Sequence, residues 1–449
     1  MLGEEAKKTI NLSLPIILGE LAQMSLHLLD SAMIGAVGYE QLAAAALVIS
    51  VVNIPFVIGI GVTVSVSQMV SLAHGRRDNQ QISHYFYNGF WLCAAFAVLI
   101  ALALNSGGNI LYHLQQDARV VEYALPFMKL LSWSIIPMLL FMTLKQFADG
   151  LQLTRAAMAL SLAALPINAF LNWLLVFGNL GFPRLELVGA GWGTLITRCL
   201  IFLALAGVVL KHPAFAEFTS ARREQWRLRT QTLKELLHIG VPAGLQMGME
   251  VGAFAVSAII IGTINAVSLA AHQIAITCAA LTFMVSMGLS QGSSIRTSNA
   301  LGRGDWRAIN NIGKSTLLMS LGLGSFFAVC FIALRSRLPL LFNENAAVVE
   351  LAAALLLLAA LFQISDSLQA IGAGLLRGIK DVKIPTVLIT VAYWIVGIPA
   401  GCLFAFYFGF GAAGIWLGFI SGLTFSAAVL SIRFLRIARL NVKKLETNI

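Results

Sequence analysis

Four polar side chains recur along an otherwise apolar stretch near the start of the chain: Glu20, Gln23, His27 and Asp30. Their spacings of three, four and three residues place all four on one face of a helix. Carboxylates and imidazoles bind protons and cations, yet these lie among residues suited to hydrocarbon. Inserting an ionisable group at the centre of a bilayer costs roughly 2.5–3.5 kcal/mol. This cost favours a functional reason for the polar face.

Two further carboxylates interrupt later apolar stretches, Glu250 in "QMGMEVGAFA" and Asp366 in "FQISDSLQAIGAG". Such acids usually face a cavity or a partner and mark an ion or substrate path, although a helix-packing role is the alternative. Asn168 and Asn172 lie four residues apart, on one helix face. Two amides aligned with the Asp30 carboxylate would make an oxygen-rich site for Na⁺. The same carboxylate out of water would favour its protonated form and could carry H⁺ instead, so both ions stay open.

The elements that must position these residues are apolar runs long enough to cross about 30 Å of hydrocarbon. The 449-residue chain is 58% hydrophobic and 11% charged, with a mean hydropathy of +0.84. Soluble domains are nearer to about a quarter charged. We therefore expect an all-α polytopic membrane protein with twelve transmembrane helices. The predicted spans are 11–37, 44–73, 83–104, 122–146, 156–178, 187–210, 233–263, 266–299, 308–333, 346–375, 383–407 and 410–437.

Positive charge is distributed unevenly between the two ends of these spans. About 21 of the 30 Lys and Arg residues fall on the side that holds both termini and the gap after every even-numbered span, and about four fall on the other side. By the positive-inside rule both termini are cytoplasmic, in a multi-pass protein of the cell's inner (plasma) membrane. A lipid bilayer thus accounts for the net charge of +10, and no nucleic acid is expected as a partner.

The chain also repeats itself. Residues 15–78 align without a gap with residues 242–305, at an offset of 227, with about 16 identities in 64 positions that include Pro15 with Pro242. A fainter match at an offset of 228 pairs "FADGLQLTR" with "LLRGIKDVK". Each repeat holds six predicted spans, so we expect two pseudo-symmetric six-helix bundles related by an axis along the membrane normal.

This repeat predicts an N-lobe over 1–210 (spans 1–6), a cytoplasmic linker over 211–232 and a C-lobe over 233–449 (spans 7–12). The linker could be an amphipathic surface helix or a plain connection, and the plain connection is favoured. Duplicated bundles are typical of transporters that rock one half against the other around a midplane site. The acids are not repeated, because Glu250 aligns with Gln23, so we expect the cation and substrate contacts to be divided unequally between the lobes.

Enzyme and cofactor motifs are absent from the sequence. It contains no HExxH and no nucleotide-binding P-loop. Its five cysteines fall inside predicted spans without a CxxC pair. We therefore expect no catalytic residues, no cofactor and no enzymatic activity, and ATP-driven transport is disfavoured for the same reason.

Three segments together resemble one family of transporters. They are "LPIILGELAQMSLHLLDSAMIG" at the start of the first half, "GVPAGLQMGMEVGAF" at the start of the second, and "LLRGIKDVKIP" after span 10. With the twelve spans and the repeat, these segments resemble the multidrug and toxic compound extrusion (MATE) family over essentially the whole chain. A Glu in span 7 and an Asp in span 10 are similar to the NorM-type branch.

The resemblance implies roles for six residues in cation binding and coupling. Asp30 would be the N-lobe coupling acid, and its site would be completed by Asn168, Asn172 and Thr194 of "GAGWGT". Some relatives have Asp where this chain has Asn172, which leaves the ion preference open. Glu250 and Asp366 match C-lobe acids associated with Na⁺ and cationic drugs. Na⁺ is thus possible at Asp30, Asn168 and Asn172, or at Glu250 and Asp366.

The function implied is secondary active multidrug export. An inward flow of Na⁺ or H⁺ would drive out amphipathic, often cationic, drugs and dyes by alternating access, in a monomer and with antibiotic resistance as an outcome. Candidate substrate contacts are Glu20, Gln23, His27, Glu250 and Asp366. His27 is expected more as an interhelical hydrogen bonder than as a proton relay, and Glu20 matches no family acid. The alternatives are a lipid-linked oligosaccharide flippase of the same superfamily, which would want a basic interior, and an intramembrane enzyme.

Overall fold

The structure is a computed structural model that describes residues 2–108, 110–113, 118–219 and 226–447. It confirms the all-α prediction, since none of the described residues forms a strand and the described part of the chain contains twelve helical spans long and apolar enough to cross a membrane. Eleven of the spans are single helices: α1 (Leu2–Gly35), α2 (Tyr39–Arg76), α3 (Asn79–Ser106), α5 (Ala118–Gly150), α6 (Arg155–Leu175), α7 (Glu186–Lys211), α9 (Thr230–Gly262), α10 (Ala266–Gly302), α11 (Trp306–Leu334), α12 (Ala346–Gly378) and α15 (Ala412–Thr447).

The remaining span, Lys383–Tyr407, is divided into α13 (Lys383–Thr390), η4 (Val391–Gly397), α14 (Ile398–Cys402) and η5 (Leu403–Tyr407), of which η4 and η5 are π-helical. The short elements are α4 (Ile110–His113), η1 (Asn179–Gly181), α8 (Pro213–Thr219) and η3 (Pro339–Leu341). Helix ends differ most from the predicted spans in α1, which begins at Leu2, and in α15, which continues to Thr447. Polar turns can extend a helix beyond the hydrocarbon, where hydropathy no longer reveals it.

The chain folds into two compact units. Unit 1 comprises Met1–Ile17 and Leu245–Ile449, and unit 2 comprises Leu18–Gly244. These units cut the chain inside α1 and α9, whereas the lobes proposed from the repeat are separated at the linker 211–232. The first half of α1 therefore belongs to unit 1 and its second half to unit 2. For α9 the order is reversed, with the first half in unit 2 and the second half in unit 1.

Close helix contacts explain this exchange. In unit 2, a Cβ placed on Gly61 of α2 would lie 2.3 Å from the Cα of Gly244. In unit 1, a Cβ on Gly288 of α10 would lie 2.8 Å from the Cα of Ile17. The two contacts are related by the repeat offset, since both 288 − 61 and 244 − 17 equal 227. Glycine at these two positions lets the backbones approach as no other residue would.

The repeat also reappears in the turns. Arg77 (φ 58°) and Gly304 (φ 72°), which the offset of 227 aligns, are both left-handed. The next residue in each copy, Asp78 or Asp305, caps the following helix by accepting a backbone N–H bond of 2.9 Å. The fainter match at an offset of 228 aligns a further left-handed pair, Gln152 (φ 63°) and Lys380 (φ 65°). Common backbone geometry supports the alignment where identities are few.

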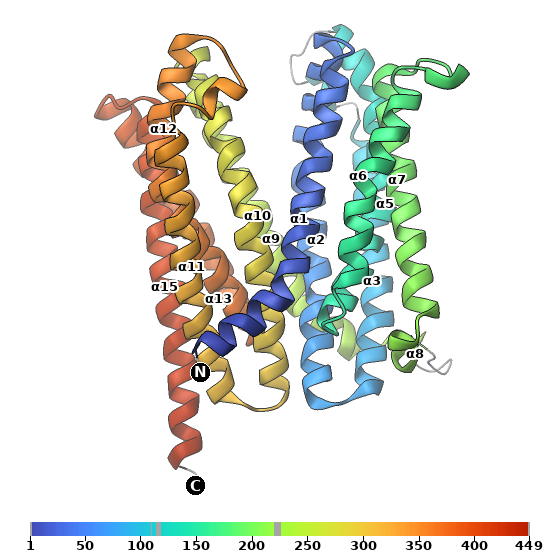
Figure 1. Cartoon of the computed structure of the whole chain (residues 1–449), viewed down its shortest axis with the longest axis vertical. Coiled ribbons are helices and arrows are strands. Elements are labelled where there is room, and N and C mark those ends of the chain that lie inside the picture. Colours follow the sequence, from blue (N-terminus) through green and yellow to red (C-terminus); the bar gives the residue numbers. More distant parts are fainter. Residues whose placement is uncertain (1, 109, 114–117, 220–225, 448–449) are drawn as a thin grey trace. The chain divides into compact units, whose positions relative to one another are not determined.

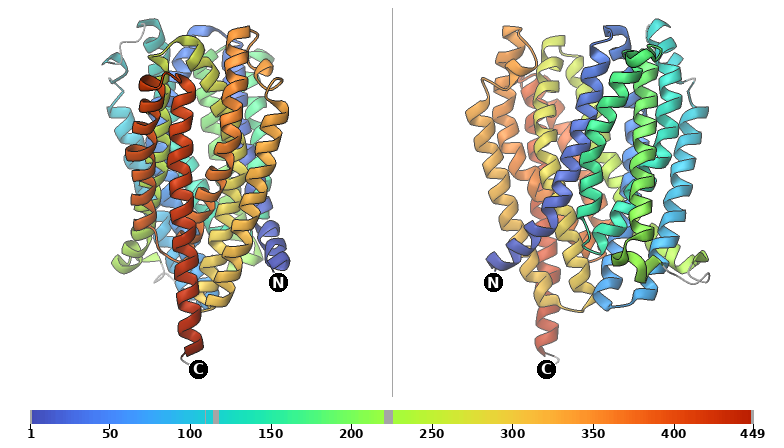
Figure 2. Two further views of the ribbon diagram at one scale, coloured as in Figure 1. Left: turned by 90° about the vertical axis from the view of Figure 1, so that its left-hand side faces the viewer. Right: turned by 45° about the vertical axis from the view of Figure 1, so that its right-hand side comes forward.

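In unit 1, α12 packs against α10, α11 and α15 (Figure 1). An aromatic group formed by Phe254, Phe362, Trp416 and Phe419 fills the space among its helices, with ring centroids 4.9–6.4 Å apart. Beyond the packed region α15 continues alone toward the C-terminus, as Figure 2 shows. In unit 2, α5 packs against α2, α3 and α7.

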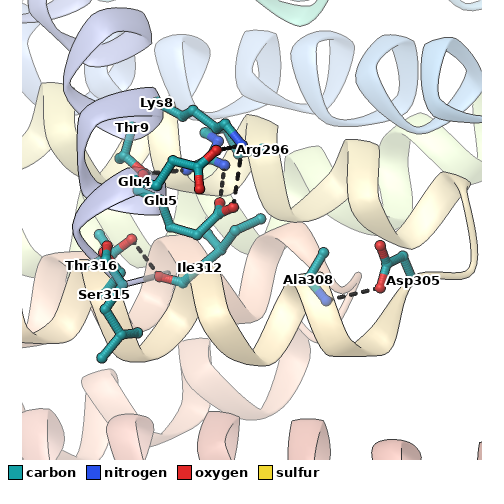
Figure 3. A network of polar contacts seen from close by, with 11 residues as sticks. Glu4, Glu5, Lys8, Thr9, Arg296, Asp305, Ala308, Ile312, Ser315 and Thr316 are labelled. Atoms are coloured by element: carbon teal, nitrogen blue, oxygen red, sulfur yellow. Dashed lines mark hydrogen bonds and ion pairs between the residues drawn. The ribbon is translucent and has the colours of Figure 1, made fainter.

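The first turns of α1 are fastened to α10 within unit 1 (Figure 3). The Arg296 guanidinium donates to the backbone oxygen of Glu5 at 2.8 Å and to the Thr9 hydroxyl at 2.5 Å, and it pairs with the Glu5 carboxylate. Ser315 of α11 also donates to the backbone oxygen of Leu2 at 3.0 Å. The polar start of α1 is thus held by side chains far along the sequence.

The predicted linker is partly helical. α8 buries Phe215 and Phe218, and Tyr87 of α3 donates to the backbone oxygen of Thr219 at 2.7 Å. Part of the predicted linker, 220–225 with Arg222 and Arg223, lies outside the described residues. In its described part the linker therefore contains a docked seven-residue helix.

Candidate functional site

Asp30 lies in a polar site within unit 2. The Nδ2 of Asn172, on α6, donates to Asp30 Oδ1 at 2.6 Å and to Asn168 Oδ1 at 3.1 Å. Thr194, on α7, donates its hydroxyl to Asp30 Oδ2 at 3.3 Å. Three helices thus converge on one carboxylate, and the two Asn side chains and Thr194 are buried. The structure brings together the four residues expected here, although their role in cation binding stays a prediction.

Gly193 makes room for the central amide of this site. A Cβ on Gly193 would lie 2.2 Å from Asn172 Oδ1. That oxygen is buried and has no hydrogen-bond partner among the described residues, because the amide directs its nitrogen toward Asp30 and Asn168. The glycine before Thr194 in "GAGWGT" therefore supports the geometry of the site.

Arg198 supplies a permanent positive charge near Asp30. It lies one turn beyond Thr194 on α7. Its guanidinium donates to the Ser134 hydroxyl at 2.7 Å and stands 5.6 Å from the centroid of the Phe56 ring. Its charge interacts with that of Asp30. Sequence reasoning assigned this residue no role, although it lies in the middle of the predicted span 187–210.

The second candidate site lies in unit 1 around Glu250 of α9. Glu250 Oε1 accepts bonds from Gln246 Nε2 at 3.1 Å and from Gln369 Nε2 at 2.8 Å. Gln369 Oε1 in turn accepts the Tyr393 hydroxyl at 3.2 Å. A single carboxylate is thus held by two amides, one from its own helix and one from α12.

Asp366 lies on α12 three residues before Gln369, and it is also buried. Its negative charge interacts with that of Glu250. Arg377, further along α12, is buried as well, and its positive charge interacts with Glu250. The structure therefore brings the two expected acids into one electrostatic group and adds Gln246, Gln369, Tyr393 and Arg377, which sequence reasoning missed. The spacing of Gln246 and Glu250, four residues on one helix, was a usable signal.

The other three polar residues of α1 have separate surroundings. Glu20 Oε1 accepts a bond of 2.8 Å from Lys145 Nζ on α5. Gln23 donates to the Met142 sulfur at 3.8 Å. The His27 side chain is exposed, and it makes none of the interhelical hydrogen bonds expected of it among the described residues. The four residues share a helix face but not a common set of partners.

The chemistry available at the two sites is that of protons and monovalent cations. Each offers carboxylate oxygens that accept bonds from amides and has one Arg nearby, and the Thr194 hydroxyl adds a bond at Asp30. The described residues contain no group of three or more His, Cys, Asp and Glu side chains that could hold a metal ion, so a transition-metal centre is not indicated for them.

Comparisons with known proteins agree with the duplication. The family described as MatE matches this chain twice, at residues 15–174 and 242–403. The chain is 32% identical over 440 residues to a "Probable multidrug resistance protein NorM" of Mesorhizobium japonicum, covering 96% of this chain and 94% of that protein. It is 33% identical over 438 residues to the protein so named from Rhizobium meliloti, with the same coverage.

Solved structures share the fold at lower identity. A crystal structure of a eukaryotic MATE transporter superposes with a TM-score of 0.89 at 20% identity, covering 99% of each chain. A mutant of a Vibrio cholerae MATE transporter also gives a TM-score of 0.89, at 17% identity over 98% of each chain.

Proposed function

Since this chain belongs to the MatE family, and within it to the NorM-type multidrug transporters, we propose that it exports amphipathic, often cationic, organic compounds in exchange for an inward flow of H⁺ or Na⁺. It is a multi-pass membrane transporter and not an enzyme. The proposal concerns the coupling ion, the substrate class and the residues that bind them.

The observation that carries the proposal is the converging set of donors on Asp30. Its two oxygens receive bonds from Asn172 and Thr194, and the Arg198 charge lies nearby. Na⁺ requires oxygen ligands, whereas Asn172 directs its nitrogen to this carboxylate. The nearby guanidinium opposes any added positive charge, and of the two ions only a proton can bind without a shell of oxygen ligands. We therefore favour H⁺ as the ion that Asp30 carries.

Glu250 and Asp366 are the proposed contacts for cationic drugs. Asp366 is buried and Glu250 is partly buried, and their negative charges interact within one unit, so a positively charged compound would relieve their repulsion. Export follows if drug and coupling ion favour different conformations, because binding of one then lowers the affinity for the other. A membrane potential of 100 mV adds about 2.3 kcal/mol for each charge moved inward.

The arrangement in the membrane completes the proposal. The excess of Lys and Arg on the side of both termini supports a cytoplasmic location for them, in the plasma membrane. We expect a monomer to be the working unit.

Export from vesicles under separately imposed gradients tests the coupling. Wild-type protein should export ethidium when an H⁺ gradient is imposed, and Asp30→Asn should abolish this export because a neutral amide cannot carry the proton. Glu122→Gln, an exposed acid of α5, is the matched control and should export like wild type. Undiminished export by Asp30→Asn would overturn the coupling role, and export driven by Na⁺ alone would replace H⁺ with Na⁺.

A further inference from the structure

A buried ion cluster in unit 2 lies apart from both candidate sites. It consists of Glu20 on α1 with Lys145 and Asp149 on α5, and we call it the Lys145 cluster. Lys145 Nζ lies 2.8 Å from Glu20 Oε1 and 3.7 Å from Asp149 Oδ2. Lys145 and Asp149 are each 1% exposed. One ammonium thus serves two carboxylates, of which Asp149 is buried and Glu20 is partly buried.

Several polar atoms in and beside the cluster have no hydrogen-bond partner among the described residues. Both oxygens of Asp149 lack a hydrogen bond among the described residues, although one is ion-paired with Lys145. The hydroxyl of Ser161, on α6, is buried and likewise has no hydrogen-bond partner in the described chain. It borders the cluster, since the Lys145 Cε and the Ser161 Oγ both lie 3.7 Å from the position of a Cβ on Gly19. Buried polar atoms normally find partners, so these three atoms mark the side of the cluster that can still accept or donate a bond.

The net charge of the Lys145 cluster indicates which ligand it can bind. Two carboxylates and one ammonium leave a net charge of −1 inside the unit, and such a charge is costly away from water. A metal cation would need the position between the carboxylates that the Lys145 ammonium already occupies. A proton needs no such space. Bound to an Asp149 oxygen, it makes the cluster neutral and leaves the bond between Lys145 and Glu20 intact.

The surroundings add no competing charge at Asp149. Of the helices packed on α5, α3 carries the buried His84 and α2 carries His74 and Arg76 in its last turn. The charged groups of α7 are Glu186, Arg198 and Lys211. The charges that act on Asp149 are nevertheless those of Lys145 and Glu20. Asp149 is followed by Gly150, the last residue of α5, so the cluster lies at a helix end.

We propose that the Lys145 cluster is a second proton-binding site, which takes up one proton on Asp149 and exchanges it with the aqueous side at which α5 ends. The proton adds to one carboxylate oxygen and no other bond breaks. The cluster would then release the coupling proton to the aqueous side, and this role rests on the proposed H⁺ antiport. Proton binding by the cluster does not rest on it.

Infrared spectroscopy of the purified full-length protein in detergent tests the binding. Stepwise acidification should add absorption of protonated carboxyl groups, and Asp149→Asn should lose the contribution of one such group. In Lys145→Met the two acids lack their ammonium, so the protonated absorption should appear at a pH higher by roughly 1–3 units. Lys129→Met, an exposed lysine on the same helix, is the matched control and should titrate like wild type.

Two results would overturn the site: an Asp149→Asn spectrum that titrates like wild type, or a Lys145→Met titration that does not move. If Asp149→Asn does not fold, Glu20→Gln replaces it. With Glu20 neutral, Lys145 pairs with Asp149 alone, and the protonated absorption should shift to lower pH; an unchanged titration would again reject the site. Asp30→Asn should keep the Asp149 signal while losing export, so failure of the antiport proposal can be told apart from failure of this one.

Discussion

Replacing Gly193 by alanine is a sharp test of the Asp30 site, because the added atom touches Asn172 and not Asp30 itself. The new Cβ would lie 2.2 Å from Asn172 Oδ1 and 3.3 Å from its Cγ. Carbon and oxygen cannot approach so closely, so the amide must rotate away. Its nitrogen would then leave Asp30 Oδ1, which it now contacts at 2.6 Å.

The size of the effect follows from the bond that is lost. A hydrogen bond to a charged group contributes about 1.5–3 kcal/mol. At 1.4 kcal/mol for each factor of ten, the population with Asn172 on Asp30 should fall roughly 10- to 150-fold. Overpacking should lower the stability of the protein by about 1–3 kcal/mol in addition.

The assay is ethidium export under an H⁺ gradient, with thermal unfolding in detergent measured alongside. Because the donated bond favours the ionised carboxylate, its loss should hold the proton on Asp30, and Gly193→Ala should export at least tenfold more slowly even at saturating H⁺. Gly207→Ala is the control on the same helix, because no atom lies within 4 Å of its added Cβ. It should be neutral or more stable by about 0.5–1 kcal/mol, as expected for Gly→Ala in a helix. Wild-type export and stability in Gly193→Ala would refute the reasoning.

Two further substitutions test other parts of the structure. Gly61→Ala would place a Cβ 2.3 Å from the Cα of Gly244, where no side chain can move aside, so the unfolding temperature should drop by an amount equivalent to about 1–3 kcal/mol; an unchanged melting curve would contradict the close packing. Arg198→Gln removes the fixed charge near Asp30, so we expect a Na⁺ gradient to support export that wild type lacks. Arg155→Gln, an exposed arginine of α6, is its control, and a Na⁺ response equal to wild type in both variants would argue against Arg198 as the cause.

The helices were predictable because the bilayer imposes a length and a composition on each of them. The repeat was predictable too, and the left-handed Arg77 and Gly304 confirm its register in three dimensions. The gathering of Asn172 and Thr194 at Asp30 followed from the family resemblance and not from spacing, since the three residues lie on different helices.

Other features could not be reached from one sequence. Helical periodicity gives the face on which Glu20 lies, but not the Lys145 ammonium that neutralises it from another helix. The role of Gly193 depends on which neighbour presses against it, and a glycine in an apolar run has many explanations. The exchange of helix halves between the units could not be predicted either, because nothing in the sequence around Ile17 or Gly288 indicates that the two residues are in contact.

That exchange has a consequence for how the protein is made. The first turns of α1 emerge from the ribosome early, yet their Arg296 contact lies 291 residues further along the chain. At translation rates of 5–20 residues per second, α1 waits about 15–60 s for this partner. Unit 1 cannot close until the second half of the protein has entered the membrane. A chain that stops in the linker would carry the start of α1 without α10, so quality control could recognise an incomplete transporter by its unpaired first helix.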